Sequence, residues 1–150
     1  TSDLIEISPI PIFVIPSNYR AKPITKITYA SDLEQLNVEL KLVEKLNNQL
    51  KTSLDVVHFQ NISEFETNKL KFEQLAAKHE QENITFYFKI YELDFSMSDQ
   101  LQSFSKKTKS SLLVLFTKAH KNWIQKFFNA SNASQLTYDG KIPLLVFHKP

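Results

Sequence analysis

Four polar side chains stand at the end of a predicted strand or just after it, where a parallel sheet presents ligand-binding groups. They are Asp32, Asp94, Thr117 and Lys149. An acid, an aspartate, a hydroxyl and a lysine in one place can bind Mg²⁺ and carry an aspartyl phosphate beside a cation. Such a site usually has two adjacent acids after the first strand, and this chain has Asp32 alone. A phosphoacceptor is therefore an alternative rather than the main expectation.

The glycine content argues against binding of phosphate by the main chain. Loops that cradle phosphates need several glycines, because their backbone takes positive φ angles and approaches the ligand closely. The chain has one glycine, Gly140. Lysine can instead bind phosphate as a point charge, and a basic cluster follows the fifth predicted strand, at Lys118, His120, Lys121 and Lys126. The simpler interpretation of this cluster is a solvated basic face.

The residue pattern supports neither nucleophilic catalysis nor metal chemistry. The chain has no cysteine, which excludes disulfides and thiolate metal sites. A G-x-S-x-G nucleophile turn is impossible with one glycine. The four histidines lack the i, i+4 spacing of a helical metal site; they are His58, His79, His120 and His148. We therefore expect no enzyme activity, no metal and no bound cofactor.

An alternation of strands and helices must position these residues. Apolar runs rich in β-branched and aromatic residues predict six strands, at Ile10–Ile15, Ile24–Ala30, Ser53–Phe59, Ile84–Leu93, Ser111–Thr117 and Lys141–His148. Apolar residues at three- and four-residue steps predict four helices, in sets that start with Leu33, Phe65, Met97 and Trp123. Ser31 or Asp32 is expected to cap the first helix, and Ser63 with Glu66 fits a capping box for the second.

From Ile24 onward the order is strand and helix four times, then a last strand. This alternation predicts an α/β fold, a three-layer α/β/α sandwich with a five-stranded, mostly parallel and doubly wound sheet. The strand at Ile10–Ile15 is extra. It matches the closing segment Ile142–Phe147, since both read Ile-Pro followed by four large apolar residues. The match predicts a tandem duplication, in which residues 1–23 are the final strand and linker of a preceding unit and residues 24–150 form the domain.

In their order and spacing, three segments of this chain resemble the universal stress protein family. They are the first-strand segment Ile27–Leu33, the strand Leu112–Thr117 and the closing Lys141–Phe147. The segment Ile15–Arg20 looks like the junction between the two units of tandem members. The resemblance covers Ile24 to Lys149 and implies five parallel strands with helices on both faces. It also implies ATP binding in many members.

In the ATP-binding members, an acidic residue after the first strand meets the adenosine and a glycine-rich loop holds the phosphates. Carried over, the acidic residue is Asp32, and the loop falls between Phe116 and Ser131, where only Ser131 fits and no glycine occurs. Family members without the loop are a class that does not bind ATP. The resemblance therefore implies that this chain does not bind ATP by the family loop. The alternative is weak ATP or AMP binding through Asp32 and the basic cluster, and a plain helix cap is the competing role for Asp32.

The closing strand is the expected contact surface with a partner. A terminal strand lies at a sheet edge in this topology, and an exposed apolar edge favours pairing. The resemblance implies dimers through this strand, and in a tandem protein the Ile10 and Ile142 segments pair within one chain. In this chain, the Ile10 segment is expected against the closing strand of the same molecule or of a neighbour. Burial under a helix is the alternative for the interface residues, Ile142, Leu144, Leu145, Val146 and Phe147.

Composition and charge limit the remaining partners. The net charge of +2 over 150 residues gives no reason to expect a nucleic-acid or membrane partner. Residues Thr1 to Ile10 lack the features of a signal peptide, which favours a cytoplasmic location. We expect a universal stress protein-like domain with a stress-response role through self-association or protein binding. Weak nucleotide binding is the first alternative and a receiver-like phosphoacceptor the second.

Overall fold

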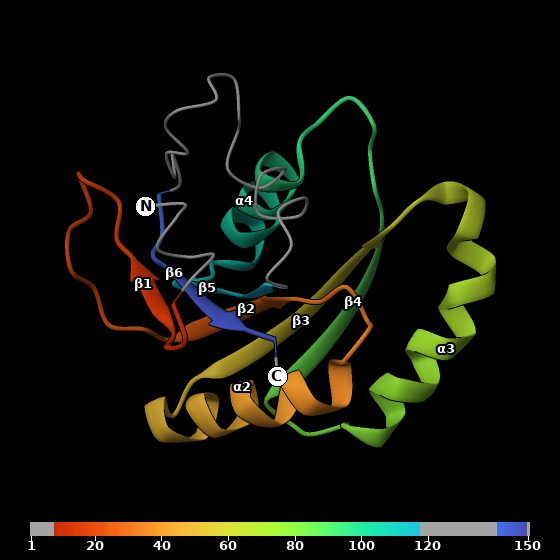
Figure 1. The fold of residues 1–150 in the computed structure, drawn as a ribbon, viewed down its shortest axis with the longest axis horizontal. Helices are drawn as coiled ribbons and strands as arrows, with labels where there is room; N and C mark the ends of the chain where they lie inside the picture. Colours follow the sequence, from red (N-terminus) through yellow and green to blue (C-terminus); the bar gives the residue numbers. More distant parts are fainter. Residues whose placement is uncertain (1–7, 118–140, 150) are drawn as a thin grey trace.

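A computed structural model describes residues 8–117 and 141–149 as a six-stranded sheet with helices on both faces (Figure 1). The helices are α2 (Leu36–Leu50), α3 (Phe65–Lys78) and α4 (Met97–Thr108), and a short 3₁₀ helix, Ile62–Glu64, precedes α3. The strands are β1 (Ile12–Val14), β2 (Lys26–Ala30), β3 (Ser53–Gln60), β4 (Ile84–Ile90), β5 (Leu112–Thr117) and β6 (Leu144–His148). In Figure 1, α2 lies below the sheet, α3 lies at its right-hand side beyond β4, and α4 lies above it.

The order of strands across the sheet is β1-β6-β5-β2-β3-β4. Strands β2 to β6 pair in parallel, and β1 pairs antiparallel with β6. The predicted α/β fold, with five parallel strands and one extra N-terminal strand, is confirmed. The last strand, β6, was expected at the edge of the sheet. It is not the edge strand, because β1 pairs with its outer side.

Two apolar clusters hold the helices on the sheet. The α2 stripe of Leu36, Leu40 and Val43 packs against the face that carries Tyr29 and Val114. On the other face, a second cluster joins α4 to the central strands, with members that include Leu101, Phe104, Leu113, Leu115 and Leu144. All six residues of β5 are buried, as expected for a strand covered on both faces.

The first helix begins later than its apolar pattern predicts. It starts at Leu36 rather than near Leu33, because Leu33 has a φ of 68° and cannot belong to a right-handed helix. Ser31 and Asp32 do not cap it. Their side-chain oxygens accept from the N–H groups of Leu33 and Glu34, at 3.0 and 3.1 Å, which forms turns instead. The predicted role of Asp32 as a helix cap is therefore wrong.

Two further differences concern element ends. The capping box is absent, because Ser63 lies within the 3₁₀ helix and α3 begins at Phe65 with no side-chain cap. The β4 strand ends at Ile90, before the predicted end at Leu93. The predicted fourth helix, around Trp123, lies outside the described residues.

Candidate functional site

The candidate site lies at the carboxyl ends of β2, β5 and β6, where the order of strands reverses. From β2 the chain proceeds outward to β3 and then β4, and it then crosses to β5 on the other side of β2. Parallel α/β sheets bind ligands outside the carboxyl ends of their strands at such a switch point. Asp32 follows β2 and Lys149 follows β6, so both predicted residues reach this place.

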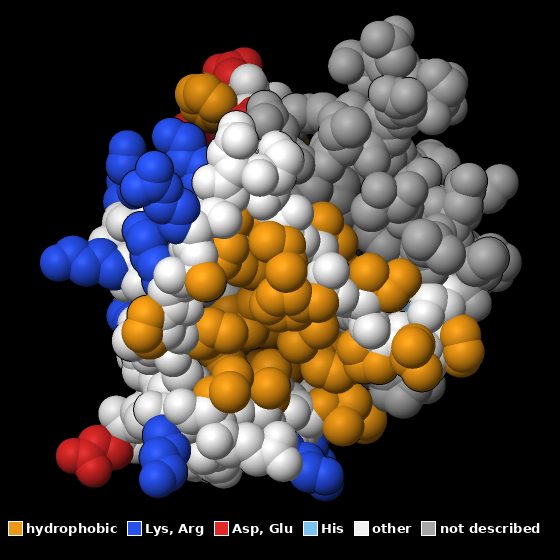
Figure 2. All heavy atoms as spheres, turned by 90° about the vertical axis from the view of Figure 1, so that its left-hand side faces the viewer, with side chains coloured by type: hydrophobic (Ala, Val, Ile, Leu, Met, Phe, Trp, Pro, Cys, Tyr) orange, Lys and Arg blue, Asp and Glu red, His pale blue; other side chains and the backbone are white. Residues whose placement is uncertain are grey.

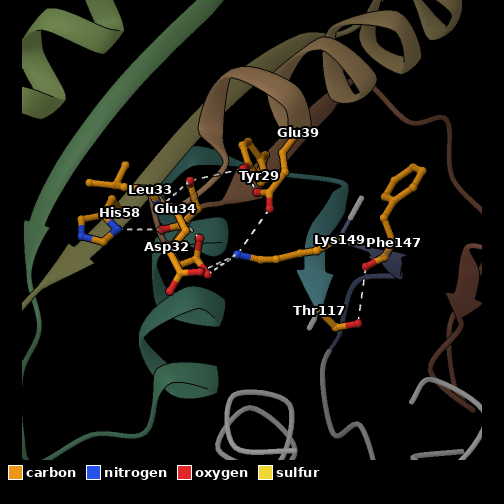
Figure 3. Close-up of polar contacts among 10 residues, drawn as sticks. Tyr29, Asp32, Leu33, Glu34, Glu39, His58, Thr117, Phe147 and Lys149 are labelled. Atoms are coloured by element: carbon orange, nitrogen blue, oxygen red, sulfur yellow. Dashed lines mark hydrogen bonds and ion pairs between the residues drawn. The ribbon is translucent and has the colours of Figure 1, made fainter. Parts of the chain in front are cut away.

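Lys149 carries its ammonium group into a cluster of carboxylates (Figure 3). Its backbone N–H donates to the carbonyl of Thr117 at 2.9 Å, which extends the β5–β6 pairing by one residue. Its side chain is only 6% exposed, and Nζ forms an ion pair with Asp32. Nζ also lies 3.4 Å from Glu39 Oε1 and 3.8 Å from Glu34 Oε2. Three carboxylates therefore share one ammonium group.

Glu39 is the most deeply buried of these acids, with 1% of its side chain exposed. Burial raises the pKa of its carboxyl group, while the Tyr29 hydroxyl and Lys149 act in the opposite direction. The Tyr29 hydroxyl donates to Glu39 Oε2, and it also lies 3.2 Å from Ser31 Oγ. Burial and the neighbouring Glu39 carboxylate raise the pKa of Tyr29, which keeps this hydroxyl protonated.

A second set of polar side chains continues the network from Ser31. The Nδ1 of His58 lies 2.7 Å from the Ser31 carbonyl, and its Nε2 lies 3.0 Å from Gln60 Oε1. Gln60 donates in turn to Glu64 at 2.9 Å and accepts from Asn68 at 3.0 Å. The network thus ties the turn after β2 to the start of α3. Among the described residues, no group of three or more His, Asp or Glu side chains is arranged to hold a metal ion.

The structure brings together Asp32, Lys149 and the backbone of Thr117, but not Asp94. Asp94 follows β4, at the far edge of the sheet, and β3 separates that strand from β2. A receiver-type site needs the flavodoxin-like order, in which the third strand of the repeat lies beside the first. The sheet order here contradicts the phosphoacceptor alternative, because the strands place Asp94 away from Asp32. Ser131 and the basic cluster of Lys118, His120, Lys121 and Lys126 lie outside the described residues.

The predicted interface residues on β6 and just before it divide between the two faces of the sheet. Leu144 and Val146 are buried in the cluster under α4, and Ile142 packs against that cluster. Leu145 and Phe147 are partly buried on the opposite face. Sequence reasoning missed Glu39 and Tyr29. A charged residue on the apolar stripe between Leu36 and Leu40 was the available signal for Glu39.

No protein-family model and no curated protein sequence matches this chain. Solved structures do resemble it. A universal stress protein from Archaeoglobus fulgidus DSM 4304 has a TM-score of 0.65 and 8% identity over 97% of this chain and 52% of its own. A putative universal stress protein from Pseudomonas aeruginosa UCBPP-PA14 has a TM-score of 0.62 and 15% identity over 98% of this chain and 55% of its own.

A third solved structure is a universal stress protein in complex with cAMP. Its TM-score is 0.59 and its identity 11%, over 85% of this chain and 98% of its own. The present chain spans about half the length of the Archaeoglobus and Pseudomonas proteins. None of the helices within the described residues has the length and apolar character needed to cross a membrane. The similarity to these three solved structures is one of backbone geometry, and this chain has the fold of the universal stress proteins.

Proposed function

We propose that this chain is a non-enzymatic association domain with the universal stress protein fold. It serves in a stress response by pairing with another unit of the same fold rather than by phosphate chemistry. The observation that carries the proposal is the pairing of β1 with β6, because its register coincides with the internal repeat of the sequence.

The register of β1 and β6 is symmetric about one residue pair. Phe13 pairs with Leu145, flanked by Ile12 with Val146 and Val14 with Leu144. The repeat aligns Ile10–Ile15 with Ile142–Phe147, so Phe13 and Leu145 are also equivalent positions in the sequence. A two-fold axis through this pair exchanges β1 and β6. Such an axis relates two copies of one surface in a symmetric assembly.

The same axis indicates what belongs on the outer side of β1. The inner side of β6 pairs in parallel with β5. An equivalent strand from a second unit would therefore lie against β1 and bury its apolar side chains. Residues 1–23 are, in this proposal, the final strand and linker of that preceding unit, and residues 24–150 are the domain to which they return.

Large apolar side chains on and beside β1 are exposed, as is typical of a surface that a partner covers. Phe13 is 45% exposed, Ile15 57% and Ile10 68%. Figure 2, which shows the left-hand side of Figure 1, has a broad group of hydrophobic side chains across the middle of this face. Contiguous apolar patches of this kind mark sites of association, and an edge strand with apolar flanks favours pairing with another strand.

Nucleotide binding is the second candidate, favoured by the neighbour that was solved with cAMP. In this chain, a nucleotide that used Asp32 would have to displace Lys149, which forms an ion pair with that carboxylate. Phosphates would also approach the carboxylates of Glu34 and Glu39. Because like charges repel strongly where burial limits solvent screening, the geometry disfavours this candidate.

Thermal melting with ATP and Mg²⁺, with AMP, and with cAMP separates the two functions. A ligand that binds only the folded state raises the melting temperature with its concentration. We expect no shift at millimolar nucleotide, and a rise of several degrees would contradict the non-binding half of the proposal.

Light scattering tests the proposal that the chain associates. In a solution of this chain, the outer side of β1 can pair with a second copy, so we expect dimers in the micromolar range. A strict monomer at high micromolar concentration would contradict self-association.

A further inference from the structure

We propose that a cavity between α4 and the edge strand β4 binds a short apolar peptide by its two charged termini. The cavity has a volume of about 770 Å³, within the usual range of ligand sites. It lies on the face of the sheet that α4 covers, beside the strand at the opposite edge from β1. It is therefore separate from the surface around β1 and from the carboxylates around Lys149.

The walls of the cavity carry large apolar side chains. Phe59 from β3 and Phe104 from α4 line its inner side, where both belong to the apolar cluster under α4. Ile90 and Phe95 also line it, and they are 44% and 53% exposed. A ligand with an apolar body would cover these exposed side chains, and the removal of apolar surface from water favours binding.

The loop from β4 to α4 is held in the shape that closes one end of the cavity. Gln100 is a buried residue that lines the cavity, and its Nε2 donates to the carbonyls of Glu92 and Phe95 at 2.9 and 3.0 Å. Its Oε1 accepts from the N–H of Glu92 at 3.0 Å. A site that is formed before its ligand arrives binds at a lower cost in ordering.

Carboxylates line one end of the cavity, and ammonium groups line the other. Glu92 follows β4 and Asp99 belongs to the first turn of α4, so both lie at the carboxyl end of β4. Lys107 lines the cavity about two turns, or about 12 Å, further along α4. An ammonium group of a ligand therefore fits the first end, and a carboxylate fits the second.

Lys89 joins Lys107 at the second end. Its Nζ lies 5.9 Å from the centre of the Tyr87 ring, so its side chain is directed back along β4. The ring centres of Tyr87 and Phe104 are 4.9 Å apart, and Phe104 precedes Lys107 by one turn of α4. Within the described part of the chain, neither lysine forms an ion pair with a carboxylate. Both ammonium groups can therefore bind the carboxylate of a ligand.

A free peptide of about four residues matches these features. In extended form it spans about 13 Å between its terminal ammonium and its terminal carboxylate, and its alternate side chains point to the same side. Its ammonium would face Glu92 and Asp99, its carboxylate would face the two lysines, and two apolar side chains would cover the inner wall. A single amino acid is too short, because its two charged groups are attached to the same carbon.

The test titrates the peptide Leu-Ala-Leu-Ala into ¹⁵N-labelled protein at neutral pH and follows the amide chemical shifts. We expect saturable shifts at the residues that line the cavity. The N-acetyl form and the C-terminal amide form each lack one charge. Each should bind about fivefold more weakly than the free peptide, which is the effect of one charged contact at a partly exposed site.

Substitutions assign each terminus to its end of the cavity. Lys107→Gln should weaken binding of the free peptide about fivefold and leave binding of the C-terminal amide unchanged, and Asp99→Asn should act in the same way on the free and N-acetyl forms. The controls are Lys106→Gln and Asp94→Asn, at exposed neighbours that do not line the cavity, and they should bind as wild type. Ser103→Trp, at an exposed residue of the cavity wall, should fill the space and abolish binding.

Several results would overturn the inference. They are no binding to wild type, equal binding of a peptide with both termini blocked, losses in the control variants as large as those in Lys107→Gln, or undiminished binding to Ser103→Trp. Association through β1 is measured by mass and involves the opposite edge of the sheet, so the two proposals can fail separately.

Discussion

At the scale of single residues, Lys149 and Glu39 bring charge into a part of the molecule with little solvent. A buried ion pair adds little net stability, but removal of one partner leaves the other charge uncompensated. Sequence reasoning placed Asp32 and Lys149 at strand ends, yet grouped them with Asp94 because it had no strand order. The ion pair between Glu39 and Lys149 joins α2 to the segment after β6, and no local sequence pattern predicts such a pairing.

Lys149→Met should lower the free energy of unfolding by about 2 kcal/mol. Loss of the ammonium leaves Asp32 and Glu39 without their cation, although protonation of Glu39 limits the cost below that of a fully buried pair. Urea unfolding at neutral pH measures the change. Lys141→Met, at an exposed lysine, is the matched control and should stay within about 0.5 kcal/mol of wild type; equal effects of the two substitutions would contradict a role for the cluster.

Glu39 predicts a distinct pH dependence. Because burial raises its pKa in the folded state, the folded protein retains a proton that the unfolded chain releases above about pH 4.3. The contribution of Glu39 to stability is therefore largest in acid and falls as pH rises toward the folded pKa. The difference in unfolding free energy between wild type and Glu39→Gln, from urea unfolding between pH 4 and 8, should shift against wild type as pH rises. A constant difference would show that the pKa of Glu39 is not raised.

At the scale of elements, periodicity predicted which segments form helices and strands, and tertiary contacts decided where they end. The apolar stripe of α2 was recognised correctly, but its start was not, because Leu33 takes a left-handed conformation that no apolar pattern reveals. The side chains of Ser31 and Asp32 are compatible with both a helix cap and a turn, and here they form turns. The end of β4 was overestimated, because Tyr91 and Leu93 continue the apolar and aromatic composition past the last paired residue.

Because glycine is scarce in this chain, lysine occupies the left-handed position after two of the helices. Lys51 after α2 and Lys109 after α4 take left-handed conformations, with φ of 54° and 59°. This position usually carries glycine, because a Cβ atom makes the conformation unfavourable. Lys109→Gly should therefore raise the free energy of unfolding by about 1 kcal/mol. Thermal or urea unfolding measures it.

The control for that substitution is Lys41→Gly, at an exposed position inside α2. It should lower the free energy of unfolding by about 1 kcal/mol, since glycine weakens a helix interior. If Lys109→Gly also destabilises the protein, this result would contradict a left-handed conformation of Lys109 at the end of α4.

At the scale of the whole molecule, the sequence repeat and the β1–β6 register are related by the same two-fold symmetry. The sequence alone showed the repeat and led us to expect that its two copies meet. It did not predict the antiparallel register centred on Phe13 and Leu145, because pairing between distant segments depends on the assembled sheet. The closing strand was predicted to be the edge, and the structure moves that role to β1, so the contact with a second unit is expected on β1.

Sedimentation equilibrium of wild type, Phe13→Lys and Val38→Lys addresses the pairing of β1 with a second unit. Phe13 lies on the edge strand, and Val38 is a similarly exposed apolar residue on α2. A lysine on an edge strand opposes strand pairing, so Phe13→Lys should be monomeric at concentrations where wild type and Val38→Lys are dimers. A wild-type monomer, or a Phe13→Lys dimer as stable as wild type, would contradict association through β1.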